Sequence, residues 1–186
     1  MIEMALAGVL LLQTPAASLV KQVASARVGL AQTMARDAEL VAAVGAKNAE
    51  KEPLEAVQKK DKEWTSRPDS PLRKALVGSP CAQRLRQLIA PDSMVIEAIL
   101  MDNQGANVCV SRETSDYWQG DEPKWQKTFR VGQEVFVDEP AYDESAHSYA
   151  VQLSVPVSEG GLRTGALTLT LKVRKEDVPA APADRQ

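Results

Sequence analysis

The spacing of the apolar residues changes once along the chain, at Pro91. Before it, from residue 19 to 44, apolar residues recur every three or four positions, the pattern of a long helix with one buried stripe. After it, apolar and polar residues alternate in segments bounded by turn residues, the pattern of strands. Helices followed by strands predict an α+β fold with an antiparallel sheet. The expected strands cover residues 94–102, 106–112, 134–142, 148–157 and 164–174.

Short signals divide the helical half further. Gly45 interrupts the first apolar stripe, and helical composition resumes over residues 53–64. Two Ser-Pro pairs follow, at residues 70–71 and 79–80, and each places an N-cap before a proline at the first helical position. They predict two short helices, the first of which ends at Gly78.

The first expected hairpin sets the two faces of the sheet. A three-residue turn at residues 103–105 pairs Asp102 with Ala106, because Gly105 can adopt the left-handed conformation that such a turn needs. One face is then apolar, and we expect the long helix to cover it. It holds Ile96, Ala98, Leu100, Val108, Val110, Tyr149, Val151, Leu153, Val155, Leu167, Leu169, Leu171 and Val173. The other face is smaller and more polar, with Glu97, Ile99, Met101, Asn107, Cys109, Ser111, Ala150, Gln152, Ser154, Ala166, Thr168 and Thr170.

Composition excludes several classes of function. A formal net charge of −3 and a pI of about 5.3 provide no basic field for a phosphate backbone, so nucleic acid is not an expected partner. His147 is the single histidine, which leaves Ser-His and Cys-His nucleophiles and multi-histidine metal sites unsupported. We therefore expect no enzyme activity, no metal and no cofactor.

The ends of the chain and its cysteines bear on the compartment. Residues 1–17 hold a short apolar run followed by small residues, which predicts a signal peptide or an amino-terminal anchor remnant, although an apolar first helical turn is the alternative. Residues 18–175 form one domain, and the Pro/Ala-rich residues 176–186 a disordered tail. Cys81 and Cys109 could form a disulfide in an oxidising compartment or remain two buried thiols.

The connection between the second and third expected strands is unusually long and aromatic. Residues 111–129 hold four of the chain's eight aromatic rings, at Tyr117, Trp118, Trp125 and Phe129. A connection of this length exceeds an ordinary hairpin loop. Folded over the polar face, it would enclose a cavity with apolar walls and a few polar anchors, as small-molecule sites have. Within it we expect Asp121 to cap a short helix, and Lys124 and Lys127 to be solvated.

Several segments resemble a known family. The long helix running into ELVAAVGAKN, then SPCAQRLRQLI, the hairpin IEAILMDNQGANVCVS, and above all SDYWQGDEPKWQKTF are similar to the Cache (PDC-type, PAS-like) extracytoplasmic sensor domains over roughly residues 18 to 175. The resemblance implies a five-stranded antiparallel PAS-like sheet, with the long helix on one face and a helix and loop lid on the other. It also implies a small ligand, often an amino acid or a carboxylate, beneath the lid.

The resemblance and the two faces together select candidate ligand-binding residues. Arg112 is the natural clamp for a carboxylate, with a surface ion pair to Glu113 or Asp116 as its alternative. Tyr117 or Trp118 would stack on the ligand, although these adjacent residues cannot both face inward on an extended segment. The remaining candidates are Trp125 from the lid and Gln152, Ser154 and Thr168 from the sheet.

Two functions follow from these expectations. The first is a periplasmic sensor module of the single-Cache form that binds a small polar metabolite. No transmembrane pattern follows Arg174, so the module would signal through a separate partner such as a membrane receptor or kinase. The second is an interaction or structural module without a ligand, in which Trp118 and Trp125 fill the cavity and the long helix mediates homodimers or docking.

Overall fold

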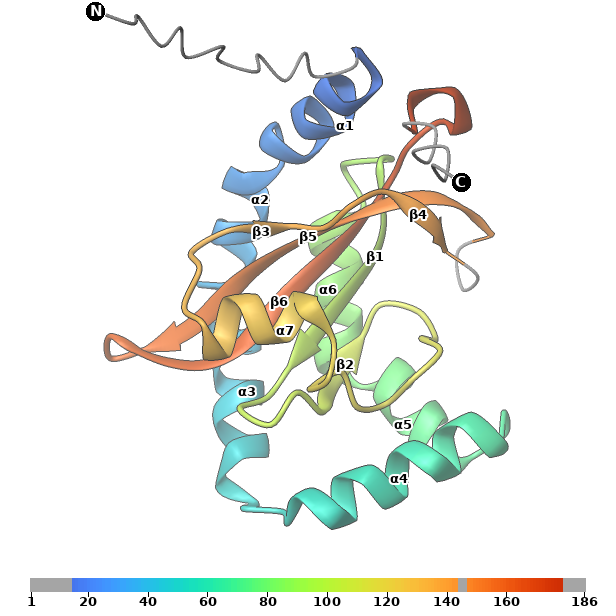
Figure 1. The fold of residues 1–186 in the computed structure, drawn as a ribbon. Helices are drawn as coiled ribbons and strands as arrows, with labels where there is room; N and C mark the ends of the chain where they lie inside the picture. Colours follow the sequence, from blue (N-terminus) through green and yellow to red (C-terminus); the bar gives the residue numbers. More distant parts are fainter. Residues whose placement is uncertain (1–14, 144–146, 179–186) are drawn as a thin grey trace, which may run out of the picture.

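The computed structural model describes residues 15–143 and 147–178. Helices cover one face of an antiparallel sheet, and a long connection crosses the other (Figure 1). This arrangement confirms the expected α+β architecture. Most of the expected leader (1–17) and most of the expected tail (176–186) lie outside the described residues.

The expected long amino-terminal helix is three helices, α1 (Pro15–Ser25), α2 (Val28–Met34) and α3 (Ala38–Ala49). The second break occurs at Asp37, whose backbone is extended. The side chain of Asp37 caps α3 by accepting from the N–H groups of Glu39 and Leu40. Arg84 holds the same carboxylate at 2.7 Å. The helix therefore restarts at a cap, and the expected interruption at Gly45 is wrong because α3 runs through that residue.

The remaining helices of this half follow the predicted signals. Helix α4 spans Leu54–Ser66, α5 spans Pro71–Gly78 and α6 spans Pro80–Ile89. The hydroxyl of Ser70 accepts from the N–H of Arg73, and that of Ser79 accepts from the N–H of Ala82. Both Ser-Pro pairs are thus confirmed as helix starts.

Within the described residues the sheet has six strands, in the order β2-β1-β6-β5-β3, with β4 also paired to β5. Their bounds are β1 Val95–Met101, β2 Asn107–Val110, β3 Phe136–Val137, β4 Ala141–Asp143, β5 Ser148–Glu159 and β6 Leu162–Lys172. The expected strand over residues 134–142 is two short strands on the same edge of β5, separated by residues 138–140. Pro140 lies in this gap and lacks the N–H that a continuous ladder requires.

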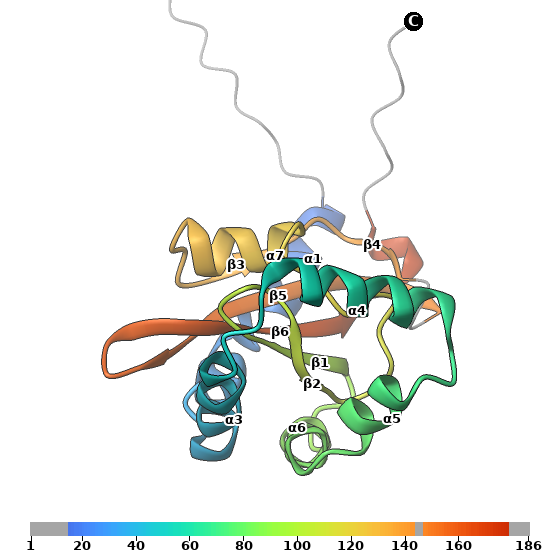
Figure 2. The same ribbon diagram turned by 90° about the horizontal axis from the view of Figure 1, so that it is seen from below.

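The main core lies between the helices and the apolar face of the sheet. Figure 2 shows α3 and α6 on this side and α7 on the opposite side. Fully buried side chains from both layers meet here, among them Met34, Leu40, Val44, Leu85, Leu100, Val151, Leu153, Leu167, Leu169 and Leu171. The predicted faces of β5 and β6 are therefore correct.

The predicted face of β2 is wrong beyond its first residues. Met101 pairs with Asn107, but Leu100 pairs with Cys109, so the register shifts by one residue at a bulge. Cys109 consequently faces the helices and joins the main core, whereas Val110 faces the lid side.

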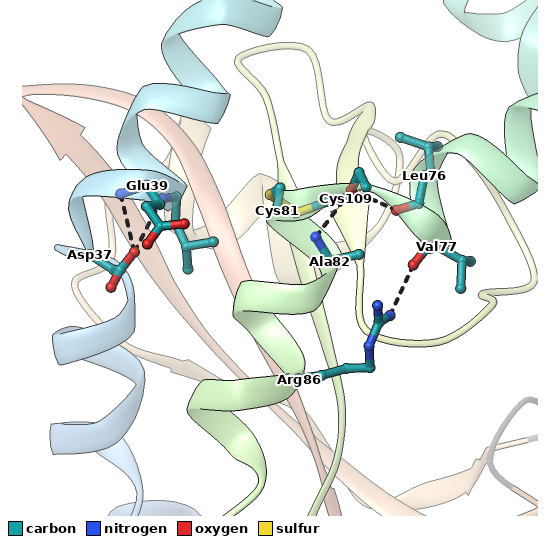
Figure 3. Close-up of a disulfide and its surroundings, with 10 residues drawn as sticks. Asp37, Glu39, Leu76, Val77, Cys81, Ala82, Arg86 and Cys109 are labelled. Carbon is teal, nitrogen blue, oxygen red and sulfur yellow. Dashed lines mark hydrogen bonds between the residues drawn. A yellow bond between two sulfur atoms is a disulfide. The ribbon is translucent and has the colours of Figure 1, made fainter.

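The same bulge brings the two cysteines together. Cys81, in the first turn of α6, forms a disulfide with Cys109 on β2 (Figure 3). In the next turn of α6, the guanidinium of Arg86 donates to the carbonyls of Val77 and Ser111. The edge of the sheet is thus joined to the helix layer by a covalent bond and by hydrogen bonds.

Candidate ligand-binding site

The connection between β2 and β3, residues 111–135, forms a lid over the polar face of the sheet. Its carboxyl-terminal part is helical, with α7 (Pro123–Trp125) continuing into a π-helical turn, η1 (Gln126–Arg130). Trp125 stacks on Phe129 with ring centroids 5.0 Å apart and donates its indole N–H to the carbonyl of Asp102 at 3.0 Å. This end of the lid is closed against the sheet. Glu122, rather than the expected Asp121, precedes the helix as its N-cap residue.

The amino-terminal part of the lid is attached to α4 and to the first hairpin. The carboxylate of Asp61 on α4 accepts from the N–H groups of Tyr117 and Trp118, at 2.9 and 3.0 Å. Trp118 donates its indole N–H to the carbonyl of Gln104 at 2.8 Å. The two tryptophans of the lid therefore use their indole N–H groups to fasten it to the first hairpin, at Gln104 and Asp102.

Under the lid lies a cavity of about 360 Å³, which we call the lid cavity. Its walls come from the lid, from β1 and β5, and from the segment that contains β4. They comprise Glu97, Ile99, Thr114, Ser115, Gln119, Glu122, Lys124, Asp138, Glu139, Ala141, Tyr142, Asp143, Ala150 and Gln152. The volume lies at the lower end of the roughly 300–1,000 Å³ typical of small-molecule sites.

Glu97 is the buried acidic residue of this cavity, with 2% of its surface exposed. Thr170 on the neighbouring strand donates its hydroxyl to Oε2 at 2.9 Å. The other oxygen, Oε1, is buried and accepts no hydrogen bond from the described chain. Burial raises the pKa of Glu97 to about 7, and the charge of Asp143 adds to this rise. The Thr170 hydrogen bond and the charges of Lys124 and Arg112 oppose it.

Gln119 supplies a second unpaired acceptor from the lid. Its side chain is 1% exposed, and its amide nitrogen donates to the carbonyl of Asp116 at 2.8 Å. This bond fixes which end of the amide is the donor, so Oε1 is left as an acceptor, and no described group donates to it. Two residues that line one cavity, Glu97 and Gln119, therefore each hold a buried acceptor oxygen to which no described group donates.

Lys124 lies inside the site, contrary to the expectation that it is solvated. It is 5% exposed and pairs with Glu122 at 2.8 Å. The position follows from the helical turn of α7, which aims Trp125 at the sheet and leaves the preceding side chain directed at the cavity. Lys127 is exposed, as expected.

The residues predicted to bind a ligand are spread over several environments. Gln152 borders the lid cavity, and Arg112 is close enough to influence the pKa of Glu97. Ser154 and Thr168 are fully buried and share a hydrogen bond of 2.8 Å between their hydroxyls, outside the cavity wall. Trp118 and Trp125 serve as the attachments described above.

Tyr117 faces a different space. It packs against Trp64 and borders a cavity of about 660 Å³ between α3, α5 and β2, on the helix side of the lid. The charged groups there are mutually paired, since Lys47 contacts Glu50 and Glu52, and Lys60 contacts Glu52. Asn107, which also lines this cavity, has a buried amide oxygen without a donor in the described chain.

Glu97, Gln119 and Lys124 were not among the predicted ligand-binding residues. A signal existed for Glu97, because it is the single charged residue of β1 and lies on the polar face of the sheet. Gln119 and Lys124 had no such signal, since their burial depends on how the lid folds back.

The sequence matches no known family model and no curated protein sequence. Solved structures that resemble it include ligand-binding and sensor domains of chemoreceptors and histidine kinases. The ligand-binding domain of the Pseudomonas fluorescens chemoreceptor CtaA, in complex with L-serine, is 13% identical with a TM-score of 0.47, and the match covers 83% of this chain and 56% of that one.

Two further sensor domains are similar to the same extent. The ligand-binding domain of the Pseudomonas aeruginosa chemoreceptor PctB, in complex with L-Arg, is 15% identical with a TM-score of 0.43, covering 82% of this chain and 51% of that one. The V. cholerae histidine kinase DctB sensor domain is 12% identical with a TM-score of 0.46, covering 83% and 54%. The chain thus spans about half the length of these domains.

Proposed function

We propose that this chain is an extracytoplasmic sensor module that binds a small polar metabolite in the lid cavity and signals through a separate partner protein. The observation that carries the ligand-binding part is that Glu97 and Gln119, which both line this cavity, each hold a buried, unpaired acceptor oxygen, Oε1. An unpaired buried acceptor costs roughly 1–3 kcal/mol, and more when it is charged. A ligand that donates to both oxygens would remove that cost.

The disulfide supports the extracytoplasmic location. Cys81 and Cys109 are bonded to each other, and structural disulfides persist in oxidising compartments such as the periplasm. Among the described residues, no helix is long and apolar enough to cross a membrane. The signalling role follows the resemblance of residues 18–175 to Cache sensor domains.

The position of the tryptophans favours ligand binding over the alternative of a module with a filled interior. That alternative requires Trp118 and Trp125 to occupy the space under the lid. Both rings are held instead by hydrogen bonds to the carbonyls of Gln104 and Asp102, and neither borders the lid cavity.

A thermal-shift screen against amino acids, organic acids, amines and sugars tests the proposed function. A ligand at a hundred times its dissociation constant adds about 2.7 kcal/mol to the free energy of unfolding. For a domain of this size that corresponds to a rise in Tm of roughly 5–10 °C. The proposal fails if no compound raises the Tm.

A cavity-filling variant locates the binding. Ala150→Leu adds apolar volume to the sheet wall of the lid cavity, and it should abolish the ligand-induced shift while the protein stays folded. Ala49→Leu makes the same change on the exposed end of α3 and should leave the shift intact. A ligand that still stabilises the Ala150→Leu variant binds elsewhere, and this site is then the wrong one.

A further inference from the structure

The described residues that line the lid cavity carry a strong excess of negative charge. Among their ionisable side chains Lys124 is the one cation, and Glu122 already pairs with it at 2.8 Å. The carboxylates outnumber it and come from β1, from the lid and from the segment around β4. They are Glu97, Glu122, Asp138, Glu139 and Asp143.

The unpaired hydrogen-bonding groups of the residues that line the cavity also favour a cation, because an ammonium group donates hydrogen bonds. The two unpaired buried groups of these residues, Glu97 Oε1 and Gln119 Oε1, are both acceptors. The amide nitrogen of Gln119 is committed to the carbonyl of Asp116, so the side chain offers the cavity an acceptor alone. A primary ammonium group has three donors and no acceptor, which matches such a pair of oxygens.

A metal ion fits this cavity less well than an organic cation. Within the parts of the chain that the structure describes, no group of three or more acidic, histidine or cysteine side chains is arranged to hold a metal. The carboxylates come from separate elements, namely β1, the lid and the segment around β4. This separation suits a molecule that carries more than one positive group.

The geometry points to a small aliphatic diamine as the ligand of the lid cavity, with one ammonium group on Glu97 and Gln119 and the second among the carboxylates of residues 138–143. This inference rests on the proposed function and assigns its ligand class. It reverses the expectation of a carboxylate held by Arg112. The positive charges of Lys124 and Arg112 act on Glu97 and oppose the binding of a cation there. The carboxylates that line the cavity outnumber these two cations.

Three four-carbon compounds that differ in their end groups test the ligand class. They are 1,4-diaminobutane with two ammonium groups, 4-aminobutanoate with one of each charge, and succinate with two carboxylates. Isothermal titration of the full chain at pH 8 and moderate salt should show binding of the diamine, binding of 4-aminobutanoate at least about tenfold weaker, and no binding of succinate.

Outcomes for the ligand class and for the proposed function are distinguishable. If succinate or 4-aminobutanoate binds as tightly as the diamine, the diamine inference is overturned and the sensor function stands. Absence of diamine binding also overturns the inference, while a metabolite found in the wider screen would keep the sensor function.

Matched variants locate the diamine. Glu97→Gln keeps the shape of the side chain and removes its charge, and should weaken 1,4-diaminobutane at least about tenfold. Glu55→Gln makes the same change on the exposed face of α4 and should leave the affinity unchanged. Lys124→Gln removes the opposing cation and should tighten the diamine about threefold. Unchanged affinity in Glu97→Gln, with its Tm confirming a folded protein, would overturn the assignment.

Discussion

The two faces of the sheet satisfy their side chains in different ways. On the helix side, β5 and β6 contribute Val151, Leu153, Leu167 and Leu169, which are fully buried and need no hydrogen-bond partner. On the lid side, the same strands contribute Ser154 and Thr168, which bond each other, and Thr170, which bonds Glu97. One face thus gains stability from apolar burial, whereas the other holds polar groups in fixed positions.

Contributions to stability and contributions to ligand binding can be separated between the two faces of the sheet. Helix-side residues contribute to the free energy of unfolding through area removed from water. Glu97 instead raises the free energy of the folded state when it is charged, because its Oε1 has no donor in the described chain. Changes on the helix side should therefore reduce stability and spare binding, whereas a change at Glu97 should do the reverse.

The largest effect is expected from the helix-side core. Leu167→Ala removes a fully buried side chain from the middle of β6 and should lower the free energy of unfolding by about 4 kcal/mol. Urea denaturation followed by circular dichroism measures this. A loss below about 1 kcal/mol would mean that this layer is not the main source of stability. Any ligand that binds the wild type should bind the folded variant with unchanged affinity.

The disulfide should rank next. Replacing Cys81 and Cys109 with alanine opens a loop of 28 residues, and the chain-entropy relation then gives a loss of about 3.5 kcal/mol. The same urea titration, performed on wild type with and without reductant, checks that the loss belongs to the bond. Equal midpoints for the oxidised and reduced wild type would contradict the prediction.

Glu97 gives the opposite sign and a dependence on pH. Its folded-state pKa of about 7 exceeds the unfolded value near 4.5, so between these values the folded protein holds a proton that the unfolded chain has released. Stability from this group is complete below pH 4.5 and falls as the pH rises to 7, by up to about 3 kcal/mol.

Glu97→Gln should remove this dependence and make the protein more stable than wild type at pH 8. Unfolding titrations of both proteins at pH 5 and pH 8 provide the measurement. If the difference between them is the same at both pH values, Glu97 does not titrate between these limits in the folded state. The charges that act on this carboxylate are those of Asp143, Lys124 and Arg112, and the hydroxyl of Thr170 donates to it.

The smallest effect is expected at a helix cap away from both faces. Ser79→Ala removes the hydroxyl that accepts from the N–H of Ala82 and should cost about 1 kcal/mol. Ser79→Asp, which can accept the same bond, should restore most of the loss. Failure of aspartate to restore stability would show that the hydroxyl matters for another reason.

Much of the fold could be predicted because it depends on local signals. The two Ser-Pro caps, the turn around Gly105 and the alternation along β5 and β6 each act over a few residues, and each appears where expected. No such signal marks the bulge, where the register shifts between Leu100 and Met101. The alternation of apolar and polar residues on either side of the bulge is compatible with pairing with or without the extra residue.

The candidate site was predicted less completely, and the reason is the lid. The aromatic rings marked the connection that lines the lid cavity, but the sequence does not distinguish a ring that binds a ligand from one that fastens a loop. Trp118 and Trp125 fasten the lid to the first hairpin, and neither lines the cavity. Its acidic wall also depends on the break of the third expected strand at residues 138–140, which brings Asp138 and Glu139 to the cavity.

The carboxylate of Asp61 makes the motion of the lid observable. It accepts from two consecutive backbone amides, those of Tyr117 and Trp118, across the boundary between α4 and the lid. If the lid lifts from α4, both amides lose their acceptor together and should show the same protection factor against exchange with solvent. A ligand that holds the lid down slows both by one common factor. Hydrogen exchange at these two neighbouring amides would therefore report how often the lid opens.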